Sequence, residues 1–356
     1  MSEQELVPLA QVETLLREKW MVVGTPGSSR ACTLNLVAVT SRPEDLPPLL
    51  DLLDHTVQHH PSRAIVLVPD ETTPDPGMAA AIHMGCPGGQ AQQYCCEHIL
   101  LHVRPAIWQH AISGVLPLLL PELPVALWWL RPFDEDPLFR RLCELTDILI
   151  VDSALANPPE DHLRSLPDLR LHCSERLLDL GWTQLTPWRE LIAQAFDPME
   201  RRPYLWELDH VHISVTDTPE GTVSALYLVG WLAGRLGWRP QTHWKGKGRT
   251  RELRFTQDDR DLRVTVHRVD TPHPTPVVRV RLSAQTAQTA RFTVEPGDTP
   301  TVAHITADVG NVHVRETVRV RWLDRGHAFV EALRLNGHDP FFEEALGIIT
   351  QILEGR

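Results

Sequence analysis

The order of strand-like and helix-like segments is the feature that most constrains the fold of this 356-residue chain. Before residue 200, short apolar runs alternate with amphipathic segments, as where the run 31–40 precedes a helical pattern over 43–59 and a second run over 63–68. This alternation favours a mostly parallel sheet with helices on both faces. Two strand-like runs within 79–103, joined by a glycine-containing turn, predict an inserted β-hairpin. We therefore expect an N-terminal α/β domain, residues 1–203, built on a mixed, mostly parallel sheet.

The pattern becomes mainly β-type after residue 203. A strand-like run at 205–216 and a helical pattern at 222–236 are followed by a series of alternating runs, whose connectors are rich in Asp, Pro and Gly. Such a series favours an antiparallel meander. A final apolar stripe with helical spacing covers 340–353. We expect a C-terminal α+β domain, residues 204–356, with an antiparallel meander and a terminal helix.

The charge distribution argues against some classes of partner. The net charge is −12, which does not suit a general binder of nucleic acids or anionic membranes. The segment 239–291 nevertheless holds 12 basic residues against 5 acidic ones. Its strand-like runs could form an exposed arginine row, with Arg249 and Arg251 on one strand, where Arg254 is a further candidate, and Arg279 and Arg281 on another. Such a row could dock on an acidic partner, and a merely solvated arginine-rich face is the alternative.

Cysteine usage and hydropathy predict a cytoplasmic protein. The six cysteines form neither a CxxC motif nor a disulfide framework, so we expect reduced thiols in a reducing compartment. The most apolar stretch, 111–130, contains three prolines and Glu122, and we therefore expect no membrane-spanning segment. The first residues also lack the basic and apolar regions of a signal peptide.

Motifs for catalysis and cofactor binding are weak. The glycine-containing loop 24–30 precedes a strand, whereas a phosphate-binding loop follows a strand and opens a helix, so a structural turn is the favoured interpretation. No GxGxxG, P-loop or GxSxG motif occurs. Cys96, His98 and His102 would share one face of a strand and could bind a metal, but buried strand thiols are the favoured interpretation. We expect no catalytic residue, no cofactor and no metal.

Five residues are candidates for contact with a ligand or partner. Asp152 and Ser153 end a strand, where ligand sites of α/β proteins usually lie, and Arg30 lies at the edge of another strand. If these three met in one cleft, the chain could be a sugar-phosphate-binding protein or enzyme, which is the alternative function. Trp128 and Trp129 close a further strand and could be core residues or interface anchors.

Four segments, in chain order, carry patterns typical of one known family. The most specific pair is LPLLLPELPVALWWL at 116–130 with FRRLCELTDILIVDS at 139–153. The strand-like run 30–39 and the helical run YLVGWLAGRLGW at 227–238 match less specifically. In these segments the chain resembles the OpcA family of glucose-6-phosphate dehydrogenase assembly proteins.

The resemblance implies a non-enzymatic assembly factor or allosteric activator of glucose-6-phosphate dehydrogenase in the oxidative pentose phosphate pathway. The dehydrogenase would be the protein partner, with no nucleic acid and no membrane. Some members of the family are linked to redox control through cysteines in the C-terminal part, but here no cysteine follows Cys173. We therefore expect oxidants and reductants to leave the C-terminal domain unaffected.

Overall fold

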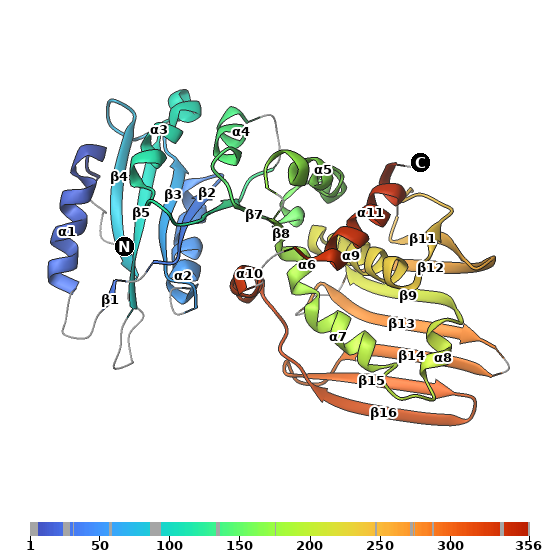
Figure 1. Ribbon diagram of the computed structural model, residues 1–356. Helices are drawn as coiled ribbons and strands as arrows, with labels where there is room; N and C mark the ends of the chain where they lie inside the picture. The colour runs from blue at the N-terminus through green and yellow to red at the C-terminus, as the bar shows by residue number, and fades with distance from the viewer. Residues whose placement is uncertain are drawn as a thin grey trace. The chain divides into compact units, whose positions relative to one another are not determined.

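The computed structural model shows two compact units, each built around one β-sheet (Figure 1). Unit 1 consists of Met1–Asp152, Asp168–Leu178 and Val330–Asn336, and unit 2 consists of Ser153–Pro167, Asp179–Phe329 and Gly337–Arg356. The described residues are 6–23, 29–30, 32–56, 59–85, 94–132, 136–174, 176–245, 248–270, 273, 275–286, 288–334 and 338–354. The division into domains at residues 203 and 204 concerns independent folding and stays a prediction.

The sheet of unit 1 has the doubly wound strand order. Its strands, in spatial order, are β1 (Ser29–Arg30), β5 (Tyr94–Val103), β3 (Ser62–Pro69), β2 (Leu34–Val39), β6 (Val125–Trp129), β7 (Ile148–Val151) and β8 (Arg176–Asp179). From β5 to β8 this is the order 3-2-1-4-5-6. The inserted strand β4 (Met78–Gly85) pairs with β5 in antiparallel fashion, whereas the pairs from β1 to β7 are parallel. The predicted mixed, mostly parallel sheet and its hairpin are confirmed.

Runs of mostly apolar residues explain why these strands are central. Every residue of β2 is buried, and so are all but the last of β3, as expected for parallel strands covered on both faces. The helices that accompany the sheet are α1 (Val12–Val23), α2 (Leu46–Thr56), α3 (Ile112–Val115) and α4 (Pro137–Cys143), and α5 (Pro159–His172) contributes residues to both units.

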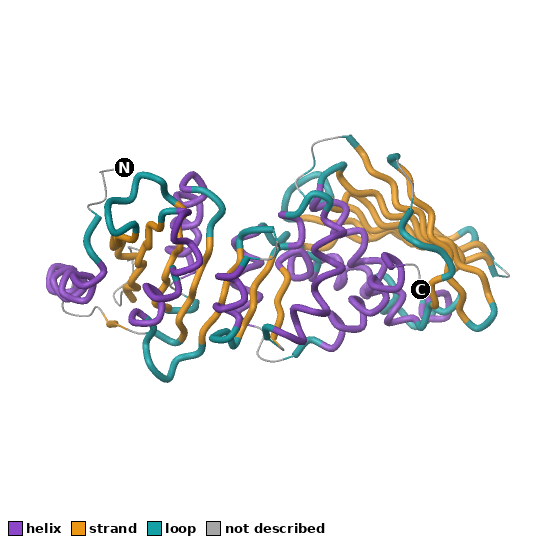
Figure 2. The backbone as a smooth tube through the Cα atoms, turned by 90° about the horizontal axis from the view of Figure 1, so that it is seen from above, coloured by secondary structure: helices purple, strands orange, loops and turns teal. Residues whose placement is uncertain are grey.

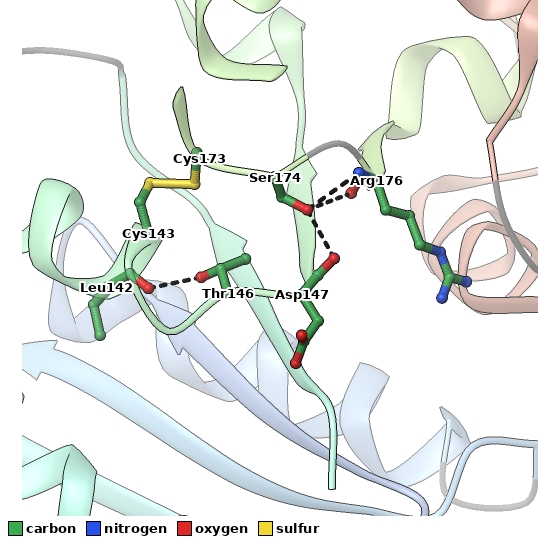
Figure 3. Close-up of a disulfide and its surroundings, with 7 residues drawn as sticks. All are labelled: Leu142, Cys143, Thr146, Asp147, Cys173, Ser174 and Arg176. Atoms are coloured by element: carbon green, nitrogen blue, oxygen red, sulfur yellow. Dashed lines mark hydrogen bonds between the residues drawn. A yellow bond between two sulfur atoms is a disulfide. The ribbon is translucent and has the colours of Figure 1, made fainter. Parts of the chain in front are cut away.

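A disulfide links the ends of two helices in unit 1 (Figure 3). Cys143 is the last residue of α4 and Cys173 directly follows α5, with their Cα atoms 4.7 Å apart. Beside the bridge, the Ser174 hydroxyl donates to the carbonyl oxygen of Asp147 at 2.7 Å. The expectation that all six cysteines are reduced is therefore wrong for this pair and for Cys95, which is also disulfide-bonded. Spacing alone could not reveal the pairing, because it depends on where α4 and α5 end in space.

The sheet of unit 2 is mostly antiparallel. Its strands, in spatial order, are β10 (Arg239–Pro240), β11 (Thr250–Gln257), β12 (Arg260–Val269), β9 (Leu208–Thr216), β13 (Val277–Gln285), β14 (Thr289–Pro296), β15 (Val302–Val309) and β16 (Val312–Arg319). The predicted antiparallel meander is confirmed except at β9 and β12, which are parallel. A parallel pair needs a long crossover, and the helix that follows β9 supplies it.

Helices of unit 2 supply the core against one face of this sheet. They are α6 (Leu180–Gln184), α7 (Thr186–Gln194), α8 (Arg202–Leu205), α9 (Pro219–Leu236) and α11 (Pro340–Glu354), and α10 (Arg325–Arg334) contributes residues to both units. Helix α9 packs closely against α11, because a Cβ at Gly230 would lie only 2.7 Å from the carbonyl oxygen of Ala345. Across the described residues, no helix is both long and apolar enough to cross a membrane.

Candidate functional site

The order of strands in unit 1 reverses between β2 and β6, where doubly wound proteins usually bind ligands. The turn after β2 contains no glycine. Its Thr40 hydroxyl donates to the carbonyl oxygen of Leu67 at 3.1 Å, and its Ser41 hydroxyl donates to that of Leu130 at 3.1 Å. Side chains therefore occupy the place where a glycine-rich turn would let a pyrophosphate approach the helix.

The tandem tryptophans next to this crevice are core residues. Trp128 and Trp129 in β6 are each 1% exposed, and the Trp129 ring lies 4.7 Å from the ring of Phe139. Neither indole ring is available to another protein, so the core alternative of the sequence analysis applies to both. What remains accessible at the end of β6 is Arg131, whose guanidinium lies 5.1 Å from the ring centroid of Trp108.

The structure separates the residues proposed for a sugar-phosphate cleft. Arg30 lies in β1, at the edge of the sheet, beside the first residues of β5. Asp152 follows β7, five strand positions away, or roughly 24 Å at the usual strand spacing. Ser153 is fully buried, and its hydroxyl donates to the carboxylate of Asp179. The expectation that Arg30, Asp152 and Ser153 meet in one cleft is therefore wrong.

One face of the sheet in unit 2 carries no helix among the described residues, and we call it the open face (Figure 2). The rings of Phe196 and Tyr204 lie 4.5 and 6.1 Å from that of Phe292, so the segment around α8 packs on the opposite face. Alternation and strand register assign the side chains of the open face. Its charged and imidazole groups are Arg239, His210, His212, Glu252, Arg254, Asp261, Arg263, His267, Arg279, Arg281, Arg291, Glu295, His304, Asp308, His313, Arg315 and Arg319.

Positive charge on the open face is only partly neutralised. The Nε of Arg279 lies 2.7 Å from an oxygen of Glu295. By contrast, Arg263, Arg281 and Arg291 form no ion pair with any residue that the structure describes. Unpaired arginines on an uncovered surface can contact carboxylates of another molecule without first breaking a contact of their own.

Neutral histidines lie among these arginines. The rings of His210 and His212 on the central strand β9 are 6.3 Å apart. Burial lowers the pKa of His210, and the charge of Arg263 lowers it further. Burial also lowers the pKa of His212, followed by the effects of His210 and Arg281. The open face therefore presents arginine charge next to two imidazoles whose pKa is lowered, an arrangement suited to an acidic partner.

Two of the four arginines predicted as one exposed row lie elsewhere. Arg251 points to the helix-covered face, where its guanidinium lies 4.8 Å from the ring centroid of Trp244 and 3.9 Å from Glu160, and burial lowers its pKa. Arg249 precedes β11 and pairs with Asp270 at 2.8 Å. The single row is therefore wrong, because Arg251 alternates with the apolar residues of β11.

The sequence analysis missed several members of the open face. Arg279 and Arg281 lie on it, as predicted from the sequence, but Arg263, Arg291 and His212 were not identified. Strict alternation within β12 and β14 could have found both arginines, because apolar residues flank each of them.

A cleft of about 820 Å³ also opens within unit 2. Its volume suits a small ligand, and the rings of Trp188 and Trp322, 5.2 Å apart, form an apolar part of its wall. Its charged lining residues are Asp217, Glu220, Asp270, Asp324, Arg321 and Arg325. The predominance of carboxylates disfavours an anionic metabolite in this cleft.

Comparison with known proteins assigns the two halves of the chain to one family. Residues 54–168 match the family model described as the glucose-6-phosphate dehydrogenase subunit N-terminal domain. Residues 175–346 match the model for the C-terminal domain of the same subunit.

Two relatives carry the name OxPP cycle protein OpcA. One, from Synechocystis, is 36% identical over 197 residues, which are 54% of this chain and 40% of the relative. The other, from Nostoc punctiforme, is 31% identical over 319 residues, which are 85% of this chain and 67% of the relative. The chain thus spans 40% to 67% of the length of these curated relatives.

A solved structure shares the fold at low sequence identity. The open conformation of KijD10, a 3-ketoreductase from Actinomadura kijaniata in complex with TDP-benzene and NADP, has a TM-score of 0.50 and 9% identity. The match covers 90% of this chain and 96% of that one, and it concerns the fold alone. The matches to both family models, together with the relative from Nostoc punctiforme, show that this chain belongs to the OpcA family.

Proposed function

We propose that this protein is a non-enzymatic partner of glucose-6-phosphate dehydrogenase, which it binds through the open face of unit 2 and holds in an active assembly. The family descriptions name subunit domains of that dehydrogenase, and the names of the relatives tie them to the OxPP cycle. The observation that carries the proposal is the set of unpaired arginines, Arg263, Arg281 and Arg291, on an uncovered sheet face. The cytoplasmic location expected from the sequence is part of this proposal.

An activator of this kind acts by differential binding. It shifts its partner toward the active assembly only to the extent that it binds that assembly more tightly than the inactive one. A coupling free energy of roughly 1–3 kcal/mol would change the affinity of the dehydrogenase for substrate by about 5–150-fold. We expect this change as a lower apparent KM for glucose 6-phosphate or as a shift of the dehydrogenase to a larger oligomer.

The alternative of an enzyme or metabolite-binding protein has less support. Arg30 and Asp152 lie five strand positions apart, and the hydroxyl of Ser153 is occupied by Asp179. The turn after β2 contains no glycine, and the hydroxyls of Thr40 and Ser41 in it are bonded to backbone carbonyls. We therefore expect the purified protein to reduce neither NAD nor NADP when glucose 6-phosphate is added.

Kinetics of the dehydrogenase from the same organism test the proposal directly. The dehydrogenase is assayed with and without an excess of this protein, and its sedimentation is measured in parallel. A several-fold lower KM or a larger oligomer supports the activator function. Unchanged kinetics together with unchanged sedimentation contradict it, as does turnover by this protein alone.

Charge reversal tests the role of the open face. Arg263→Glu with Arg291→Glu removes two exposed, unpaired charges from that face. The matched control, Arg42→Glu with Arg164→Glu, changes the net charge equally at two exposed arginines elsewhere. We expect at least tenfold slower association for the first variant and a weaker dependence on salt, because screening acts on the charges that were removed. Equal association rates for both variants would exclude the open face as the docking surface.

A further inference from the structure

Three potential metal ligands from different elements of unit 1 lie together on one side of its sheet. Asp54 is on α2, His83 on β4 and His98 on β5, and their ligand atoms all lie within 4.8 Å of one another. The Nε2 of His83 lies 3.2 Å from one carboxylate oxygen of Asp54, and the Nδ1 of His98 lies 3.4 Å from the other. The two imidazole rings stack with their centroids 5.5 Å apart. This cluster is independent of the open face, which belongs to unit 2.

The backbone is arranged so that the carboxylate can reach the two imidazoles. His83 and His98 are directly opposite each other in the antiparallel register of β4 and β5. Gly85 lies two residues along on the same side of β4, and a Cβ there would lie 2.5 Å from a carboxylate oxygen of Asp54 and 2.7 Å from the His98 ring. Only glycine leaves room for this approach of the helix to the hairpin.

Two buried atoms of the cluster have no hydrogen-bond partner among the described residues. His98 is 1% exposed, and its Nδ1 makes no hydrogen bond to any of these residues. The facing oxygen of Asp54 is likewise buried without a partner among them. Leaving such groups unsatisfied is unfavourable. A cation bound between the two atoms would satisfy both.

The cluster is open to solvent on one side. The side chains of His83 and Asp54 are 33% and 35% exposed, which leaves a path for an ion from solvent.

We propose that Asp54, His83 and His98 bind a divalent cation of the Zn²⁺ class, which fastens α2 to the β4–β5 hairpin. Two imidazoles and one carboxylate suit Zn²⁺ and its neighbours better than Mg²⁺ or Ca²⁺, which prefer all-oxygen sites. Ligands of a tetrahedral Zn²⁺ bound at 2.0–2.1 Å are about 3.3 Å apart. The imidazoles of His83 and His98 lie 3.2 and 3.4 Å from different oxygens of Asp54, and the three ligand atoms lie within 4.8 Å of one another, so small side-chain shifts would bring them to that spacing. Water completes the coordination.

Titration of the chelator-treated, tag-free full chain with Co²⁺ and Zn²⁺ tests this site. We expect one equivalent to bind, with the intense visible absorption of four- or five-coordinate Co²⁺, and Zn²⁺ to displace it. His83→Gln and Asp54→Asn should each weaken binding at least tenfold. Gly85→Ala keeps every ligand but fills the gap and should weaken binding as well.

The His102–Asp70 pair supplies matched controls. Its Nδ1–Oδ2 distance is 2.9 Å, and it uses the same strand and residue types outside the cluster. His102→Gln and Asp70→Asn should bind the metal like the parent protein. Zn²⁺ should also raise the Tm of the parent and of His102→Gln, but not that of His83→Gln, because only the folded state with an intact site gains binding free energy.

The outcomes that overturn the site are equally concrete. Equal affinity of His83→Gln and the parent, or loss of binding only in His102→Gln, would place the metal elsewhere. If one equivalent of metal does not bind at about 100 μM, which corresponds to a binding free energy of roughly −5.5 kcal/mol, the proposed site does not exist. Circular dichroism of each variant shows that it is folded. Neither result bears on activation of the dehydrogenase, which is measured separately.

Discussion

Replacing both cysteines of the Cys143–Cys173 bridge with serine should destabilise the protein by a few kcal/mol. The bridge joins residues separated by 30 positions in the sequence. In the chain-entropy treatment, a cross-link over that length lowers the entropy of the unfolded chain by about 12 cal/mol/K, or about 3.6 kcal/mol at 25 °C. Because unfolded chains retain some structure, we expect a measured loss of about 2–4 kcal/mol.

Urea unfolding, monitored by hydrogen exchange of peptides from α4 and β7, measures this loss of stability in the elements next to the bridge. With a slope of about 2 kcal/mol/M, a loss of 3 kcal/mol lowers the midpoint by roughly 1.5 M. The variant is a cleaner perturbation than dithiothreitol, because Cys95 is disulfide-bonded as well. Thiol titration of the denatured parent protein provides the control for the bridge itself.

A loss below about 1 kcal/mol in a protein whose bridge is confirmed would refute the reasoning. It would mean that the unfolded chain is already restricted in this region, or that the two helix ends meet equally well without the bond. A reactive Cys143 or Cys173 in the native parent protein would remove the premise.

Other perturbations have equally specific outcomes. Gly230→Ala should lower the free energy of unfolding by about 1–3 kcal/mol, because the new Cβ meets the Ala345 carbonyl. Gly347→Ala has open space around its Cβ and should raise the free energy of unfolding by about 0.5–1 kcal/mol. Thermal unfolding of both variants tests these two expectations. Burial lowers the pKa of His210 and His212 from the ordinary value of 6.5. On acidification the unfolded chain therefore binds more protons than the folded one. The contribution of these two histidines to stability is complete above pH 6.5 and is lost as the pH falls below it. Urea midpoints between pH 7.5 and 5.5 should therefore fall, and less steeply for His212→Gln. Dithiothreitol should leave hydrogen exchange in β13 to β16 unchanged, because no cysteine follows residue 173, and a change there would contradict this expectation.

The fold class could be predicted from the sequence because apolar residues recur with a different spacing in strands and in helices. The mostly apolar run of β2 and the alternation in β12 are local patterns. They reflect a strand covered on both faces and a strand covered on one face. The parallel β9–β12 pair was not predictable in the same way, since it depends on which side of β9 the chain returns to after α9. Local periodicity therefore gives the elements, while the pairing requires the three-dimensional path.

The candidate sites show the same limit. Arg251 is tolerated on the covered face because Trp244 and Glu160, distant in sequence from each other, surround its guanidinium. Of the residues considered for a metal on one strand, only His98 belongs to the cluster that the structure forms. Its companion Asp54 comes from a helix more than forty residues earlier, a pairing that no spacing rule on one strand could reveal.

Each unit is assembled from three separate stretches of the chain. A single cut in the gene, wherever it falls, therefore cannot release one unit whole: a fragment of the other always travels with it. Recombination at one junction would likewise exchange incomplete halves, unlike the shuffling of modules arranged one after another. No single junction in the chain therefore separates the elements of one sheet from those of the other.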